Sequence, residues 1–186
     1  MKKLSTKNIF IPMPMSIVGS TVHGKTNFMA VGWVVRANAN PPMIAIGIGR
    51  HHYTCEGIKA NEAFSVNFPG TNLLHQADYV GLVSGEKIDK SQVFETFQGE
   101  LEHAPLIKDA ALCLECRLVQ TVELPSNNLY LGEIVAGWSD DRYMTDNKLD
   151  LKKMDVFFLS MPDNRFWGLG EVLGKAWNPE NKTLNI

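Results

Sequence analysis

Residues 24–50 read GKTNFMAVGWVVRANANPPMIAIGIGR and contain two short apolar runs. The runs are Phe28–Val35 and Met43–Ile48, and a polar link, Arg36–Pro42, separates them. Each run is too short for a stable helix and contains β-branched residues, so the pattern predicts two β-strands. The two prolines of the link cannot donate ladder hydrogen bonds and therefore direct the chain out of the sheet.

Small and anion-friendly residues surround these two strands. Gly32, Gly47 and Gly49 leave space where a flat ligand or another backbone can come close. Residues 50–54, RHHYT, follow the second strand and precede a helical pattern, Cys55–Asn61, for which Thr54 is the expected N-cap. A helix N-terminus favours phosphate, so we expect a strand pair that binds a planar, phosphorylated cofactor.

Length and composition are those of an ordinary globular protein. The chain has 186 residues, 45% of them hydrophobic and 20% charged, which predicts one domain over residues 1–186. The net charge of −2 and the pI of about 6.2 create no strong positive field, and the basic residues are scattered. We therefore expect no nucleic-acid partner.

The sequence also predicts a cytoplasmic protein with no membrane partner. No apolar run approaches the roughly 20 residues that a membrane span needs. Pro12 and Pro14 interrupt the apolar part of the N-terminus, and no small-residue cleavage site follows. Three cysteines, an odd number, argue against a disulfide framework and fit a reducing compartment.

The rest of the chain predicts a mainly β fold with short helices. Many short strands and few helices favour a closed antiparallel barrel with helices at its ends. The turn between the first full strand and the next falls at Val22–Lys25, with Gly24 as the permissive residue. The further strands expected are Ile9–Pro14 (an edge strand or extended arm), Met15–Val22, Ala63–Phe68 (half-buried), Ala111–Leu124, Leu129–Trp138, Val156–Ser160 and Arg165–Leu169; the further helices are Ser91–Phe97 and one from Thr71 to about Val80.

Most familiar catalytic motifs do not occur in the sequence. Cys113 and Cys116 lie three residues apart on a predicted strand, so their side chains point to opposite faces and cannot form a redox or metal pair. No His, Asp or Glu spacing resembles a metal site, and Ser84 lacks the G-x-S-x-G elbow of a hydrolase. There is no G-x-G-x-x-G or Walker A loop, so side chains must hold any phosphate.

Two residues keep two interpretations each. Cys55 stands at a predicted helix start, where a thiolate is stabilised, or it is simply a small helix residue. Trp33 either stacks against an aromatic ligand or fills the core. A bound phosphate would be held by a set of side chains gathered near the second strand, namely Arg50, His52, Thr54 and Lys90.

The order of several segments resembles the flavin reductase-like, FMN-binding split-barrel family, and within it the flavoredoxin branch. The resemblance starts with the segment NFMA (27–30), Trp33 and the proline pair, and continues with Arg50 and Tyr53-Thr54. It extends through FSVNFP, ADYVGLVSGEKIDK, LECRLVQTVEL, LYLGEIV and GLGEVLGKAW, and so covers nearly the whole chain. It implies a six-stranded Greek-key split β-barrel, a homodimer, and one FMN per subunit at the dimer interface.

The resemblance also implies which residues bind FMN. The backbone of 27–30 would face the isoalloxazine with Trp33 beside it, and residues 36–38 would line the ribityl chain and phosphate. The phosphate would be held by Arg50, His52, Tyr53 and Thr54, and Lys90 would reach the same cofactor. The implied cofactor-binding residues are Asn27, Phe28, Met29, Ala30, Trp33, Arg36, Ala37, Asn38, Arg50, His52, Tyr53, Thr54 and Lys90.

The expected function is that of a flavoprotein that passes hydride or electrons between NAD(P)H or a redox protein and an acceptor. The flavin carries out the chemistry, so no side chain is assigned as catalytic and no metal is expected. Direct electron carriage without an NAD(P)H site is one alternative. A non-catalytic flavin- or haem-binding split-barrel protein for storage or sensing is another, and a structural homodimer with an empty cleft is a third.

Overall fold

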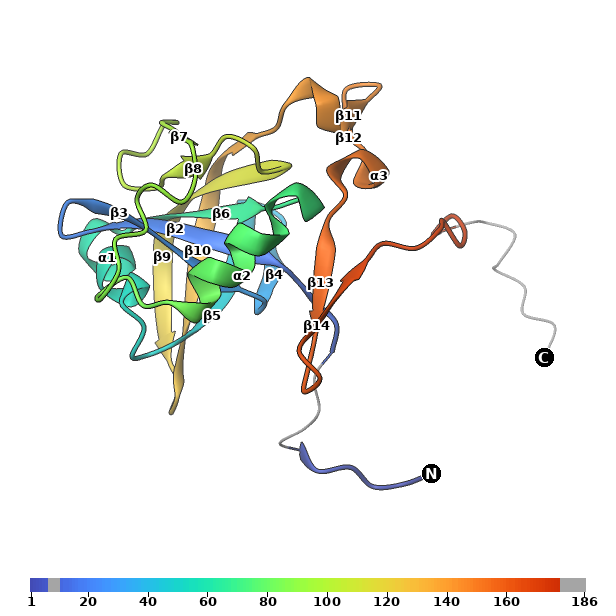
Figure 1. Cartoon of the computed structure of the whole chain (residues 1–186), viewed down its shortest axis with the longest axis horizontal. Coiled ribbons are helices and arrows are strands. Elements are labelled where there is room, and N and C mark those ends of the chain that lie inside the picture. Colours follow the sequence, from blue (N-terminus) through green and yellow to red (C-terminus); the bar gives the residue numbers. More distant parts are fainter. Residues whose placement is uncertain (7–10, 178–186) are drawn as a thin grey trace.

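The largest sheet of the protein has seven antiparallel strands in the order β3-β2-β6-β9-β10-β5-β4 (Figure 1). The structure is a computed structural model and describes residues 1–6 and 11–177. The strands of this sheet are β2 (Ser16–Val22), β3 (Lys25–Val31), β4 (Val34–Asn38), β5 (Met43–Gly49), β6 (Ala63–Phe68), β9 (Leu112–Glu123) and β10 (Asn127–Trp138).

The connection between β3 and β4 closes this sheet into a barrel. The two strands are consecutive in sequence but lie at opposite ends of the strand order, and only Gly32 and Trp33 join them. Three Cα–Cα steps span at most about 11 Å, so the two outer strands must meet at this link. The Trp33 carbonyl accepts a hydrogen bond of 2.8 Å from the Gly47 backbone N–H, which ties the link to β5. The sheet therefore forms a split barrel, as expected.

The predicted strand Phe28–Val35 is wrong as a single element, because the chain turns a corner at Gly32 and Trp33. The same run supplies two strands, so the sheet has seven strands instead of the implied six. The polar link was also placed too early, since β4 continues to Asn38 before the chain turns towards β5.

Two helices cover the barrel. Helix α1 (Thr54–Asn61) packs against β2 so closely that a Cβ on Gly57 would lie 2.5 Å from the Thr21 carbonyl oxygen. Only glycine permits that approach. Helix α2 (Leu74–Leu82), preceded by the 3₁₀ turn Thr71–Leu73, packs on β3 (Figure 1). Within the described ranges, every helix is too short or too polar to span a lipid bilayer.

A second, smaller sheet stands beside the barrel (Figure 1). In it β13 pairs with β1 on one side and with β14 on the other. The elements of this sheet and of the connecting segments are β1 (Met13–Pro14), β13 (Phe157–Ser160), β14 (Arg165–Gly168), the pair β7 (Thr96–Phe97) and β8 (Leu106–Ile107), the pair β11 (Met144–Thr145) and β12 (Lys148–Leu149), the 3₁₀ turn Asp141–Tyr143, and α3 (Leu151–Met154).

Strand β9 divides two hydrophobic clusters. Cys113 belongs to the cluster under α2, whereas Cys116 belongs to the cluster that includes Ile58 of α1 and Tyr130. Both thiols are free and buried, which confirms that the two side chains point to opposite faces. Burial raises the pKa of Cys113 to about 12 and raises that of Cys116 further. These thiols are therefore inert core residues.

The prediction of a half-buried strand at Ala63–Phe68 gave the right bounds but the wrong burial. Its polar side chains are covered by the segment that contains β8. Ser65 donates a hydrogen bond to the Pro105 carbonyl, and the Asn67 side chain accepts one of 3.0 Å from the Ile107 N–H. Alternating polarity here marks buried hydrogen bonds instead of a solvated face.

The predicted helix Ser91–Phe97 is wrong. The chain makes turns there, with the Ser91 N–H bonded to the Asp89 carboxylate and the Val93 N–H bonded to the Lys90 carbonyl, and it ends in β7. A run of seven residues is too short to form a helix without help from packing.

The other predicted elements agree with the structure to within a few residues. The hairpin turn at residues 23–24 has positive φ at both positions, as its glycine indicated. For the predicted strand Ile9–Pro14, residues 9 and 10 lie outside the described residues, and β1 covers Met13–Pro14.

Candidate binding site

Two pockets border strand β3. Asn27 lines one pocket and Met29 lines the other. These two residues are two positions apart on the strand, which places them about 7 Å from each other. The apolar pocket has a volume of about 220 Å³ and is lined by Met13, Met29, Ala30, Val31, Gly32, Trp33, Gly47, Ile48, Gly49, His52, Asn127, Leu159 and Met161. The polar pocket has a volume of about 470 Å³ and is lined by His23, Lys25, Thr26, Asn27, Tyr53, Gly85, Glu86, Lys87, Ile88, Asp89 and Lys90.

Aromatic side chains of the protein occupy the space above the glycines of β5. A Cβ on Gly47 would lie 3.2 Å from the Trp33 ring, and one on Gly49 would lie 3.0 Å from the His52 ring. The glycines therefore make room for these two rings, which then form walls of the apolar pocket. Trp33 is 50% exposed, so it is not a core residue and its ring can stack on a second aromatic group.

The polar pocket contains a buried oxygen atom that lacks a donor. Asn27 is 4% exposed, and its Nδ2 donates a hydrogen bond of 2.8 Å to the Thr54 Oγ1. Its Oδ1 is buried and has no partner among the described residues. Buried amide oxygens are almost always satisfied, so this atom indicates a donor group on a bound molecule or a water.

Cationic groups outnumber acidic ones around the polar pocket. Lys25, Lys87 and Lys90 line it, against Glu86 and Asp89. The Lys25 ammonium lies 4.0 Å from the Asp89 carboxylate, which is a weak exposed pair. The excess of amines suits an anionic group such as phosphate.

Lys90 is buried and hydrogen-bonded to the protein. Its Nζ donates to the Phe28 carbonyl at 2.9 Å and to the Val80 carbonyl at 2.8 Å. Burial lowers the pKa of its ammonium to about 8. The residue therefore joins the C-terminal turn of α2 to β3 while it borders the polar pocket.

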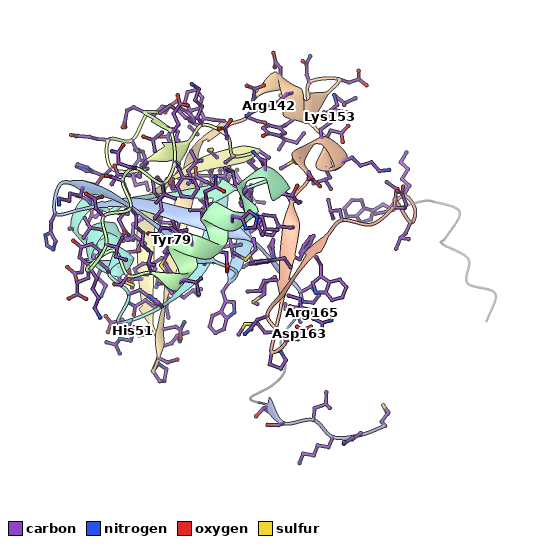
Figure 2. All side chains as sticks on the ribbon, viewed as in Figure 1. His51, Tyr79, Arg142, Lys153, Asp163 and Arg165 are labelled. Atoms are coloured by element: carbon purple, nitrogen blue, oxygen red, sulfur yellow. The ribbon has the colours of Figure 1, made fainter. Side chains whose placement is uncertain are left out.

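The histidine pair lies in the loop between β5 and α1. The rings of His51 and His52 stack with their centroids 4.4 Å apart. Partial burial is the main cause that lowers the pKa of His52, and the neighbouring His51 and Lys90 lower it further. His52 is therefore neutral near pH 7. Figure 2 shows His51 at the rim of the barrel, where it points outward.

Some predicted site residues lie outside both pockets. Arg36, Ala37 and Asn38 are exposed on β4, where the Arg36 Nε donates to the Asn38 carbonyl at 2.8 Å. Arg50 lies 3.6 Å from the Glu123 carboxylate at the other end of β5. Phe28 is buried in the core.

The start of α1 differs from its prediction. The helix follows Tyr53, and Thr54 is its first residue instead of its N-cap. The Cys55 thiol is buried and donates to the Gly49 carbonyl at 3.5 Å. Burial is the largest cause of the raised pKa of Cys55, which disfavours the thiolate and supports the other interpretation, a small helix residue.

The loop between α2 and the Lys90 position was the main omission of the sequence reasoning. Gly85 and Lys87 line the polar pocket, and a Cβ on Gly85 would overlap the Asn27 amide. The sequence identified 81–90 only as a loop. The sequence feature that indicated a binding loop was a glycine, Gly85, followed closely by Lys87 and Lys90.

Replacing Cys113 by serine tests the exclusion of a thiol relay. The thiol donates to the Ile107 carbonyl at 3.2 Å and lies outside both pockets bordering β3, so serine can keep the contact. We expect electron-transfer rates of C113S within about twofold of wild type, measured by stopped-flow absorbance. A drop of tenfold or more in a folded variant would mean that this thiol takes part in the chemistry.

Comparison with known proteins agrees with this geometry. The family model described as "Flavin reductase like domain" matches residues 8–151. The crystal structure of flavoredoxin from Methanosarcina acetivorans superposes with a TM-score of 0.94 at 49% identity and covers 96% of both chains. Flavoredoxin of Desulfovibrio vulgaris (Miyazaki F) superposes with a TM-score of 0.89 at 28% identity, over 97% of this chain and 99% of that one.

A more distant relative comes from Aeropyrum pernix. This uncharacterized protein is 27% identical over 141 residues, which cover 74% of this chain. The matched region is 53% of that relative, so the match spans about half of its length.

Proposed function

The chain belongs to the flavin reductase like domain family, and from this premise we propose that it binds FMN and transfers hydride or electrons between NAD(P)H or a redox protein and an acceptor. The observation that carries the proposal is the pair of pockets along β3. One has apolar and aromatic walls suited to a planar ring, and the other has amines suited to a phosphate.

The residues present fit this cofactor. Met29, Ala30 and the exposed face of Trp33 would contact the isoalloxazine, and the neutral His52 would border it. The orphaned Asn27 Oδ1 would accept a hydrogen bond from a ribityl hydroxyl. When bound, the flavin supplies the redox chemistry, and the side chains bind and orient it and exclude water.

The phosphate would lie in the polar pocket with Tyr53 and the lysines. In one copy Arg50 faces Glu123 outside this pocket. Residues 36–38 also lie outside it, so they would contact the cofactor only through a second copy of the chain. We propose a homodimer on that ground, together with the apolar surface discussed below. A cytoplasmic location and one domain over residues 1–186 complete the proposal.

The spectrum of the purified protein tests the function. We expect the purified protein to show the visible absorbance of FMN. This absorbance should decrease when NADH or NADPH is added in the absence of oxygen. Bleaching by dithionite alone would favour an electron carrier that lacks a nicotinamide site. A colourless protein that does not take up added FMN would contradict the proposal.

A matched pair of variants locates the phosphate. We expect Lys87→Ala to weaken FMN binding by about tenfold, since one charge-assisted contact to phosphate is lost. Riboflavin has no phosphate, so its affinity should stay unchanged. Fluorescence titration with both ligands measures this.

Arg50→Ala is the control for that prediction. Its guanidinium faces Glu123, so the change should leave the affinities for both FMN and riboflavin within about twofold of wild type. If instead Arg50→Ala weakens FMN selectively and Lys87→Ala does not, the phosphate lies beside Arg50.

A further inference from the structure

The last part of the described chain is an apolar arm. After β14 the chain continues with residues 169–177, LGEVLGKAW. Leu173 is 101% exposed and Trp177 is 97% exposed, and Val172 is also exposed. Figure 1 shows this segment leaving the side of the barrel and running outward.

One contact directs the base of the arm. The Lys152 Nζ on α3 donates to the Glu171 carboxylate at 2.8 Å. This exposed pair lies at the base of the arm, and the tip of the neighbouring β13–β14 hairpin carries Asp163 and Arg165 (Figure 2). Large apolar side chains exposed to water are costly, because burying a leucine or a tryptophan is worth about tenfold or more in an equilibrium constant. The arm therefore indicates a surface that covers it.

The same chain carries an apolar groove of about 530 Å³. Its described lining has no charged side chain, and three of its residues are large and exposed: Trp33, Val35 and Leu124. The groove adjoins the apolar pocket, since Gly32, Trp33 and Gly47 line both. A contiguous apolar surface of this kind marks an interaction site.

We propose that residues 169–177 of one copy dock in the apolar groove of a second copy, with Leu173 and Trp177 as the anchors. Both surfaces are on one chain, so a twofold axis covers both arms and both grooves at once. The partner arm then lies beside Trp33 at the edge of the apolar pocket. This inference rests on the homodimer of the proposed function and assigns the segment that forms it.

The arm belongs to a part of the chain outside the family match, which ends at residue 151. The match to the Methanosarcina flavoredoxin spans 96% of the chain, so it includes at least part of the arm.

Cross-linking between different variants tests the docking directly. Val35→Cys and Leu173→Cys are prepared separately, and their mixture is treated with a short bis-maleimide in the absence of flavin. The three native cysteines are buried, so their background is low. We expect a covalent heterodimer in the mixture and far less product from either variant alone. A mixture without that product would overturn the proposal, as would a Val35→Cys/Leu173→Cys double variant that links within one chain.

Mass measurement gives an independent readout. Leu173→Asp with Trp177→Ala should raise the dimer dissociation constant by about a hundredfold or more in sedimentation velocity. Leu82→Asp is the matched control, because this leucine is 77% exposed on α2, away from arm and groove. An unchanged dimer in the arm variant would overturn the proposal. Both tests use flavin-free protein, so a failure of flavin binding would leave their outcome readable.

Discussion

Glu115→Ala should lower the free energy of unfolding by about 3 kcal/mol, because three part-buried donors lose the buried carboxylate that accepts from them. Glu115 is fully buried in β9. Its carboxylate accepts from the Leu101 N–H at 2.7 Å, from the Glu100 N–H at 3.1 Å and from the Trp138 Nε1 at 2.7 Å. One side chain thus joins β9, the end of β10 and the loop between β7 and β8.

Urea unfolding of the flavin-free protein measures this effect. With a slope of about 2 kcal/mol/M, the midpoint should fall by about 1.5 M. Glu100→Ala removes an exposed carboxylate from the same loop and should stay within about 0.5 kcal/mol of wild type. A loss below 1 kcal/mol for Glu115→Ala would show that water or another acceptor replaces the carboxylate.

A second variant examines the same contact from the other side. A Cβ on Gly99 would overlap the Glu115 carboxylate, so Gly99→Ala should destabilise the protein as well. Because both changes disturb one contact, their effects should not add in the double variant.

Glu115 also illustrates how far the sequence could predict the structure. The alternation in Ala111–Leu124 predicted the strand and separated Cys113 from Cys116 correctly, because side-chain direction follows a period of two. It could not predict that this polar face is buried at Glu115, whereas it is exposed at Arg117. The donors that satisfy Glu115 come from residues 14 to 23 positions away, and no local pattern records such pairings.

The site was also predicted only in part. The stretch 24–50 identified the barrel strands and several residues that line the pockets, because glycines, aromatic residues and turn residues act locally. The corner at Gly32 and Trp33 was missed, since a continuous apolar run gives no sign that its two halves lie on opposite edges of a sheet. The sequence predicts no element after Arg165–Leu169, and the exposure of the outward arm follows from the fold.

Lys90→Met should weaken FMN and riboflavin alike, by about tenfold each, and lower the free energy of unfolding by about 1–3 kcal/mol. Methionine removes both hydrogen bonds and leaves the Phe28 and Val80 carbonyls without their donor. Phe28 lies on β3 between Asn27 and Met29, which line the two pockets. Losing the Lys90 contact to this strand would therefore disturb the pocket for the flavin ring and the pocket for the phosphate together.

The contrast with Lys87 separates positioning from direct contact. Lys87→Ala should reduce only FMN affinity, whereas Lys90→Met should reduce both, and fluorescence titration with both ligands distinguishes them. A selective loss of FMN affinity in Lys90→Met would return Lys90 to the role of phosphate ligand that the residues near the second strand predict.

The pH dependence of the free energy of unfolding tests the role of Lys90 separately. Its pKa is about 8 in the folded protein, below the ordinary lysine value of about 10.4, because burial penalises the ammonium. Between about pH 8 and pH 10 the unfolded chain therefore binds more protons at this residue, so its contribution to stability rises with pH. A neutral amine still has two N–H groups for the two carbonyls, so the hydrogen bonds persist.

The stability difference between wild type and Lys90→Met should therefore widen from pH 8 to pH 10, as measured by urea unfolding at each pH. Other groups near Lys90 are His52, which is neutral throughout this range, and the Lys25–Asp89 pair, which borders the same pocket. These groups are present in both proteins and cancel in the difference. A difference that stays flat would mean that water reaches the Lys90 ammonium and keeps its pKa near that of an exposed lysine.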